Sequence, residues 1–220
     1  MKIVQLASAL AVATLCACSA LRPEATPHRG FYTLDGARSI ALAGSTTARM
    51  AMLAAGAPTL IVNPPHAAAG FDSPHIVYMR EAHKLEHFAH SDWIDPPARM
   101  LAPLIVAAIE ESGAFRAVVA TPSPALGELR LDTEIIRLQH DFQAQPSRVR
   151  FTLRAYLVEV KTRRVLASRE FDRAVPAAGE NPYAGVVAAN LAVRAVLADL
   201  AAFCAESARA AAPTRAPSTP

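Results

Sequence analysis

The chain has 220 residues, 52% of them hydrophobic, and a formal net charge of only +3 at pH 7. This composition is sufficient for a hydrophobic core, and the length suits one domain of ordinary size with terminal tails. The basic residues are mostly scattered arginines without a basic block, so a nucleic-acid partner is not indicated.

The N-terminus has the pattern of an export signal. Met1 and Lys2 are followed by a stretch without charge from Ile3 to Ala17. A basic start, a short apolar run and small residues at its end are typical of a secretory signal, and the run is shorter than the ~20 apolar residues of a membrane span. Residues 1–17 are therefore predicted to be a signal peptide, and the residues at its end indicate a lipoprotein signal peptide.

The tetrad Leu15-Cys16-Ala17-Cys18 resembles a bacterial lipobox, which places Leu three residues before the modified Cys. We therefore predict that Cys18 carries a covalent lipid and that Cys16 leaves with the signal. Stable anchoring needs more than one acyl chain, because each buried methylene contributes only ~0.8 kcal/mol, and three chains on one residue satisfy this. The alternative is an ordinary signal cleaved near Ala20.

Ser19, not Asp, follows the modified position. In the sorting pattern of bacterial lipoproteins this favours the outer membrane, so we expect a chain anchored on its periplasmic face in a Gram-negative bacterium. Residues 18–30 are expected to form an extended tether. The lipid on Cys18 is the only prosthetic group predicted, with no other cofactor.

Brief apolar runs separated by Pro, Gly and polar residues predict short strands in the first half of the domain. These strands are residues 31–34, 59–62, 75–80 and 84–88, of which the last two form a hairpin. Residues 39–56 are expected to be loop or irregular structure.

A helix is predicted after this hairpin. Asp95 is expected to cap it, Pro96 to occupy its first position, and Gly113 to end it in a left-handed conformation. Apolar residues from Leu101 to Ile109 recur at helical spacing. Pro103 predicts a kink or a late start.

Longer strands follow a short one that begins at residues 115–119. The alternation from Leu129 to Ile135 changes phase at Ile136, which predicts a bulge. Residues 148–160 alternate regularly and indicate a half-buried antiparallel strand, and residues 165–171 return the chain.

The last helix is expected to be capped by Asn181 and opened by Pro182, with an apolar stripe that includes Asn190 and ends at Cys204. Asn190 is expected to be a buried hydrogen-bonded group or part of a subunit contact, and Cys204 a small core hydrophobe. The tail, residues 205–220, is rich in Ala and Pro and is predicted to be disordered.

This order of elements predicts an α+β fold, a mostly antiparallel sheet with two main helices packed on one face. The single domain is expected to span residues 31–204.

The sequence has no glycine-rich phosphate loop, no Gly-x-Ser-x-Gly and no His-Glu-x-x-His motif. His83, His87 and His90 lie close together, but they fall on predicted strand and loop, and we interpret them as polar edge residues without a metal. No catalytic residue is predicted, and the protein is not expected to be an enzyme.

Two features are candidates for contact with a partner. Arg148, Arg150 and Arg154 alternate along one strand and would form a basic stripe suited to lipid headgroups or an acidic protein. The alternative is a solvated sheet face with acidic neighbours. Trp93, the single Trp, is either a lid on the core or an interface residue.

The ordered set of these features resembles a known family. The features are the lipobox, Phe31 to Leu34, Ile61 to Pro65, and the segment from Tyr78 to Pro97, followed by the paired strands and the alanine-rich last helix. Together they are similar to the ABC-type transport auxiliary lipoproteins, which include the paraquat-inducible protein C group.

This resemblance implies a non-catalytic component of an intermembrane lipid transport system. Its partners would be an MCE-domain protein, a permease and an ATPase, which move lipids, expected to be phospholipids, across the periplasm. The lipoprotein would dock the MCE assembly at the outer membrane, and a ring-shaped homo-oligomer is a further implication. The alternatives are an adaptor in another envelope-assembly process and a periplasmic lipid carrier, which would need a large apolar cavity.

Overall fold

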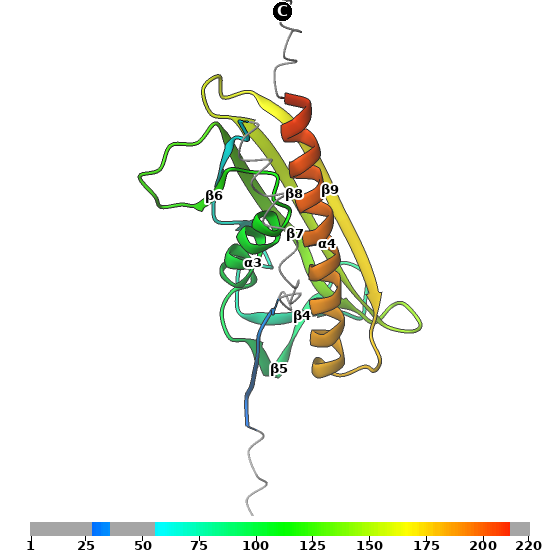
Figure 1. Ribbon diagram of the computed structural model, residues 1–220. Helices are drawn as coiled ribbons and strands as arrows, with labels where there is room; N and C mark the ends of the chain where they lie inside the picture. The colour runs from blue at the N-terminus through cyan, green and yellow to red at the C-terminus, as the bar shows by residue number, and fades with distance from the viewer. Residues whose placement is uncertain (1–27, 36–55, 212–220) are drawn as a thin grey trace, which may run out of the picture.

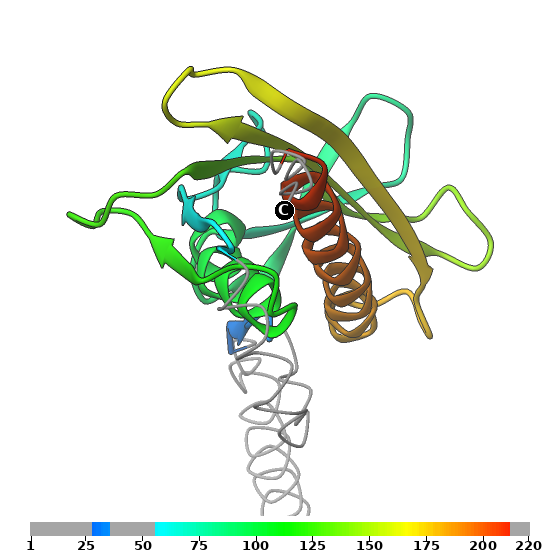
Figure 2. The ribbon, with the colours of Figure 1, turned by 45° about the horizontal axis from the view of Figure 1, so that its top comes forward.

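The computed structural model of the chain describes residues 28–35 and 56–211, and the predicted loop at 39–56 lies almost wholly outside them. The described part is a single α+β domain in which two helices cover one face of a curved sheet (Figures 1 and 2). Its elements are β1 (Gly30–Tyr32), β2 (Thr59–Val62), β3 (His66–Ala67), β4 (His75–Met79), β5 (Leu85–Trp93), α3 (Pro97–Glu111), β6 (Ala117–Ala120), β7 (Leu129–Asp141), β8 (Arg148–Glu159), β9 (Val165–Pro176) and α4 (Pro182–Ala211).

Strand β7 is the centre of the sheet. On one side it pairs along its length with β8, which in turn pairs with β9. On its other side it pairs with β2 near its start, β3 near its middle and β4 at its end, and β6, β5 and β1 extend the sheet from there. The two ends of β7 therefore carry different groups of strands.

The expectation of a mostly antiparallel sheet is confirmed for the long pairs, although short parallel pairs make the sheet mixed. Strands β4–β5, β7–β8 and β8–β9 are antiparallel as predicted, but β1–β5, β2–β6, β2–β7, β3–β7 and β4–β7 are parallel. The parallel pairs are only two to four residues long. They arise because the segments between the paired strands, among them α3, bring the chain back in the same direction, which hairpin turns cannot do.

The core lies between β7–β9 and the two helices. Phe151, Leu153 and Leu157 of β8 are fully buried, as the alternating pattern of this strand predicts. The predicted bulge in β7 is confirmed, because the β7–β8 register shifts between Ile135 and Arg137. Because of this bulge, apolar side chains before and after the shift, such as Ile135 and Leu138, both face the helices.

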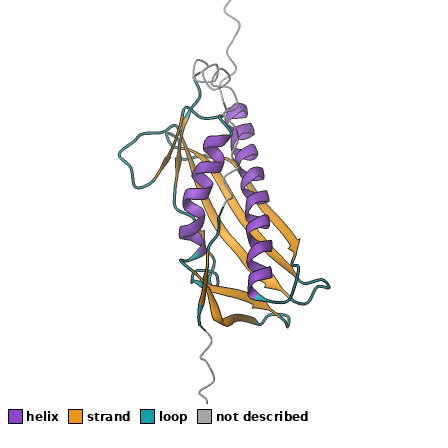
Figure 3. Cartoon of the chain, turned by 60° about the horizontal axis from the view of Figure 1, so that its bottom comes forward, coloured by secondary structure: helices purple, strands orange, loops and turns teal. Residues whose placement is uncertain are grey.

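Helix α4 packs along β8 and β9, and α3 packs beside it (Figure 3). The Asn181 Oδ1 accepts a 2.9 Å hydrogen bond from the Ala184 N–H, so the predicted cap is confirmed.

The helix continues to Ala211 and not Cys204, so the predicted disorder is wrong for residues 205–211. Alanine favours helix, and Ala205 and Ala208 are buried against the core.

By length and composition α4 could cross a membrane, and among the described residues it is the helix that passes this test. However, 56% of its most apolar window is buried inside the domain. We therefore describe α4 as a core helix, whose apolar face is explained by its packing on the sheet.

The first helix, α3, begins at Pro97, with Pro96 at the cap position and no side-chain cap, so Asp95 does not cap it as predicted. The Asp95 carboxylate instead accepts a bond from Arg99 at 3.4 Å. Gly113 adopts φ +63° after the helix, as predicted. Pro103 lies inside the helix on its exposed side and does not delay its start.

Candidate functional site

The lipidation candidate Cys18 lies outside the described residues, but the point where the tether joins the domain is well defined. Strand β1 pairs in parallel with the end of β5, with Phe31 opposite Asp92. The Asp92 carboxylate is almost fully buried and lies 3.1 Å from the Arg29 guanidinium and 3.0 Å from the His75 Nδ1. These contacts attach the first described residues to the sheet.

The same segment is also attached to α4. The Asn190 side chain donates to the Thr33 carbonyl at 3.2 Å and accepts from the Asp35 N–H at 2.8 Å. It donates as well to the Val186 carbonyl of its own helix at 3.1 Å. The prediction of a hydrogen-bonded Asn190 is confirmed, although the residue is half-buried. The chain therefore enters the domain fixed to both of its layers.

Trp93 lies one residue beyond Asp92 and points into the core. Its side chain is only 3% exposed, and it lies opposite Tyr32 in the β1–β5 pair. With Gly185 and Ala189 of α4 it lines a small cavity of about 10 Å³, room for one water at most. Of the two sequence interpretations, the structure shows the lid on the core, while the neighbouring Ile94 is exposed.

Arg148, Arg150 and Arg154 lie on the outer face of β8, as the alternation predicts, but each has a carboxylate partner. They contact Asp141 at 3.2 Å, Asp172 at 3.0 Å, and Glu134 and Glu170 at 3.3 and 2.9 Å, respectively. The stripe is therefore a paired surface and not a free basic one. Whether it contacts a partner stays a prediction.

The strongest of these contacts joins Arg150 and Asp172. The guanidinium hydrogen bonds lower the pKa of the Asp172 carboxyl, and the hydroxyl of Thr152 adds a further bond at 3.0 Å. The pKa of Arg150 is raised for the same reason. Sequence reasoning found the arginines but not this partner, because only the β8–β9 register places Asp172 beside them.

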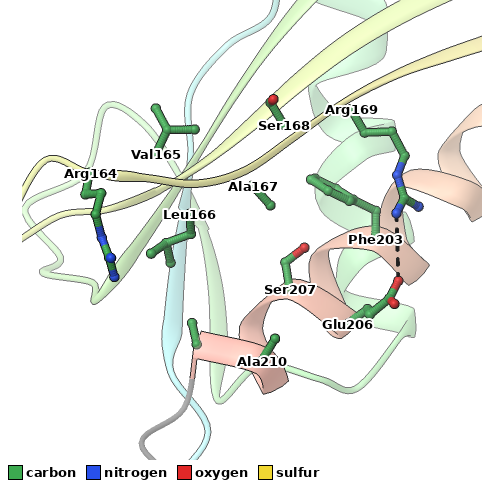
Figure 4. Close-up of a pocket in the computed structure, with 11 residues that line it drawn as sticks. Arg164, Val165, Leu166, Ala167, Ser168, Arg169, Phe203, Glu206, Ser207 and Ala210 are labelled. Carbon is green, nitrogen blue, oxygen red and sulfur yellow. Dashed lines mark ion pairs between the residues drawn. The ribbon is translucent and has the colours of Figure 1, made fainter.

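An open groove lies between β9 and the C-terminal half of α4 (Figure 4). Its volume is about 480 Å³, and its walls combine Leu166 and Phe203 with the polar side chains of Ser168 and Ser207. The Arg169 guanidinium lies over the Phe203 ring at 4.9 Å and 3.9 Å from Glu206. Sequence reasoning missed this groove because two elements distant in the chain form it.

Neither the groove nor the cavity beside Trp93 is a closed apolar space of lipid size. The groove is open to solvent and carries arginine, serine and glutamate side chains, and the cavity holds one water at most. These two spaces therefore give no support to the alternative of a lipid carrier, which needs a pocket that buries most of its ligand.

The three clustered histidines are not brought together by the fold. His83 lies in the β4–β5 turn with φ +67°, and His87 stacks on His75 with ring centroids 4.4 Å apart. Within residues 28–35 and 56–211, no group of three or more His, Cys, Asp or Glu side chains is arranged to hold a metal.

Two further titratable groups are buried in the core. Burial raises the pKa of the Cys204 thiol to about 12, so it remains protonated and unsuited to nucleophilic attack. Burial lowers the pKa of His140, whose Nε2 lies 3.0 Å from the Ser147 hydroxyl. The His140 Nδ1 has no hydrogen-bond partner and faces Gly185 of α4. Sequence reasoning did not single out this residue.

A family model described as "ABC-type transport auxiliary lipoprotein component" matches residues 41–202. Among solved structures, protein XCC0632 from Xanthomonas campestris (DUF330) is similar at 26% identity and a TM-score of 0.67, covering 72% of this chain and 89% of its own. A second structure, of an uncharacterized protein, shares the fold at 12% identity and a TM-score of 0.61, with coverages of 81% and 99%. No curated protein matches the sequence.

Proposed function

Because the chain belongs to the ABC-type transport auxiliary lipoprotein family, we propose that it is the membrane-anchored, non-catalytic adaptor of an ABC-type transport system in the cell envelope. The observation that carries this proposal is the family match over residues 41–202, which spans nearly all of the folded domain. The lipobox-like tetrad that ends at Cys18 stands in front of that domain and supports an anchor.

We further propose that the system is of the MCE type and moves phospholipids between the two membranes. The adaptor would be held on the periplasmic face of the outer membrane by acyl chains on Cys18, since Ser19 follows it. Its role would be to dock the MCE-domain protein, whose permease and ATPase lie in the inner membrane. The chain would thereby fix the outer end of the transport path.

The attachment of the tether suits such a role. Arg29 is paired with the buried Asp92 of the sheet, and Asn190 of the helix layer binds residues 33–35. These contacts hold the residues that follow the tether to both layers of the domain, and they would resist a load applied through an anchored N-terminus.

Co-purification tests the proposal. The full chain would carry a C-terminal affinity tag and be isolated from detergent-solubilised envelopes, and the recovered proteins would be identified by mass spectrometry. We expect an MCE-domain protein, a permease and an ATPase with the wild-type chain, and membrane release of the Cys18→Ala variant. Recovery of a cell-wall synthase instead would favour the alternative envelope adaptor. In cells that lack the native protein, the Cys18→Ala variant should fail to restore resistance to agents that damage the envelope. Full restoration by a variant released from the membrane would contradict a tethered adaptor.

The outer face of β8, with Arg148, Arg150 and Arg154, is the partner surface that we propose for this docking, and Trp93 is left out of it because its side chain is buried. An exchange of charges, Arg150→Asp with Asp172→Arg, keeps an ion pair while reversing its orientation. We expect this double variant to fold normally and to recover less MCE-domain protein. The matched control is Arg99→Glu on α3, whose guanidinium is also paired and exposed but lies on another surface. Equal recovery from both variants would argue against this surface.

A further inference from the structure

We propose that the end of the domain where the tether enters rests on the bilayer, with Phe31 and Ile94 inserted at the boundary between headgroups and acyl chains. This inference rests on the proposed lipid anchor at Cys18 and adds the orientation of the domain. We call Phe31, Ile94 and Tyr183 the tether-end patch.

The first observation is that two large apolar side chains are exposed side by side. Phe31 is 59% and Ile94 61% exposed. Phe31 lies opposite Asp92, and the Ile94 N–H continues the β1–β5 pairing by donating to the Tyr32 carbonyl at 2.7 Å. Because side chains alternate along a strand, Phe31 and Ile94 point away from the core, whereas Tyr32 and Trp93 point toward it.

The second observation is the length of chain in front of this patch. Nine residues, 19–27, separate Cys18 from the first described residue, His28. Fully extended at 3.3–3.6 Å per residue they span about 30 Å, and as a flexible coil about 15–18 Å. The chain then reaches β1 within two further residues, where Arg29 holds it to Asp92. An acylated Cys18 therefore keeps this end of the domain near the bilayer.

The third observation is that an aromatic side chain of α4 is exposed at the same end. The first turns of α4 meet the end of β7, since His140 lies against Gly185, and β7 pairs there with β4 of the group that carries β1. Tyr183 in the first turn of α4 is 65% exposed. Figure 1 shows the start of α4 at the same end of the domain as β5 and the blue strand β1. Exposed aromatic side chains are typical of membrane–water interfaces.

The chain offers a matched control at the opposite end. Leu126 is 93% exposed and lies in the loop between β6 and β7, next to the start of β7 at Leu129. The 13 residues of β7 span about 40 Å at ~3.3 Å per residue, so this loop lies far from the tether-end patch. The same substitution can therefore be compared at both ends of one molecule.

The experiment uses the acylated full chain reconstituted into vesicles of phosphatidylethanolamine and phosphatidylglycerol, with or without bromine on the acyl chains. Phe31→Trp, Ile94→Trp and Leu126→Trp are compared with the wild type, whose buried Trp93 gives the background fluorescence. We expect brominated lipid to quench the added Trp at positions 31 and 94 at least twofold. At position 126 we expect no quenching beyond background.

Vesicle flotation and circular dichroism separate the outcomes. If the chains are folded and float but positions 31 and 94 are quenched no more than position 126, the bilayer contact is wrong while the anchor stands. In that case the exposed apolar side chains of the tether-end patch would be available for contact with a protein. If the wild-type chain does not float, the anchor of the proposed function has failed, and this inference fails with it.

Discussion

The two faces of the β7–β9 sheet are built from alternate residues of the same strands, yet they are held in different ways. The inner face is mostly apolar, and Phe151 and Leu153 are fully buried beneath the helices. The outer face carries ion pairs such as Arg150 with Asp172, whose side chains are both more than one-third exposed.

This difference suggests that the inner face provides most of the folding stability and that the outer face is free to recognise a partner. Burial of apolar area contributes about 25 cal/mol per Å², so each fully buried inner side chain stabilises the fold by about 1.5–3 kcal/mol. Exposed ion pairs contribute about 0–1 kcal/mol each because water and salt screen them. The outer face can therefore change its charges at little cost to folding, which makes it the better place to specify a partner.

The largest expected effect is at the inner face. Phe151→Ala should lower the free energy of unfolding by about 3–5 kcal/mol, because it removes a buried ring and leaves a cavity. Arg154→Ala, three residues later on the outer face, is the control and should change it far less, because water and salt screen its exposed ion pairs. Urea denaturation of the domain measures both. Similar losses for the two variants would remove the distinction between the faces.

A second large effect is expected where α4 meets the end of β7. A Cβ at position 185 would lie 2.7 Å from the His140 Nδ1, so Gly185→Ala should cost about 1–3 kcal/mol by overpacking. The double variant with His140→Ala should show a smaller penalty for Gly185→Ala, since the clashing ring is gone. Thermal unfolding of the four proteins in this cycle gives the coupling. An additive cycle would show that the two residues do not meet.

A smaller effect is expected at the start of α4. Asn181→Ala removes the acceptor for the Ala184 N–H and should cost about 1 kcal/mol. Asn181→Asp keeps an acceptor at this position and should restore most of the stability. A drop in midpoint temperature that Asp does not reverse would assign the effect to something other than the cap.

The smallest effect is expected for the outer ion pair. A double-mutant cycle on Arg150 and Asp172 should give a coupling energy below about 1 kcal/mol at pH 7. The folded-state pKa of Asp172 is lowered, so this contribution is present above the ordinary pKa of about 3.9 and is lost as the pH falls through the lower folded value. High salt should reduce it too. A coupling that high salt leaves unchanged would contradict the ion-pair explanation.

The sequence predicts these two faces better than it predicts the rest of the sheet. The alternation in residues 148–160 was enough to assign β8 and its buried side, and the phase change at Ile136 indicated the bulge correctly. Short strands such as β3 and the parallel pairs of β2 carry no such signal, because they depend on how distant segments meet. The end of α4 was missed since an alanine-rich segment suits both a helix and a tail.

The candidate site also has a part that the sequence predicts and a part that only the fold reveals. The arginines of β8 were recognised from their spacing, but their neutralisation by Asp141, Asp172 and Glu170 needs the strand register. Burial decides the role of Trp93, and nothing in its sequence neighbourhood distinguishes a lid from an anchor. The tether-end patch was invisible because Phe31 and Ile94 are 63 positions apart, 31 to 94, in the sequence.

The central claim is that acyl chains on Cys18 hold this domain at a membrane, and the mass of the mature N-terminus tests it most directly. The protein would be purified from envelopes without chemical release, digested, and its N-terminal peptide analysed by mass spectrometry. We predict a peptide that begins at Cys18 and carries a diacylglyceryl group and a third acyl chain. An unmodified peptide that begins after Cys18, for example near Ala20, would contradict the claim.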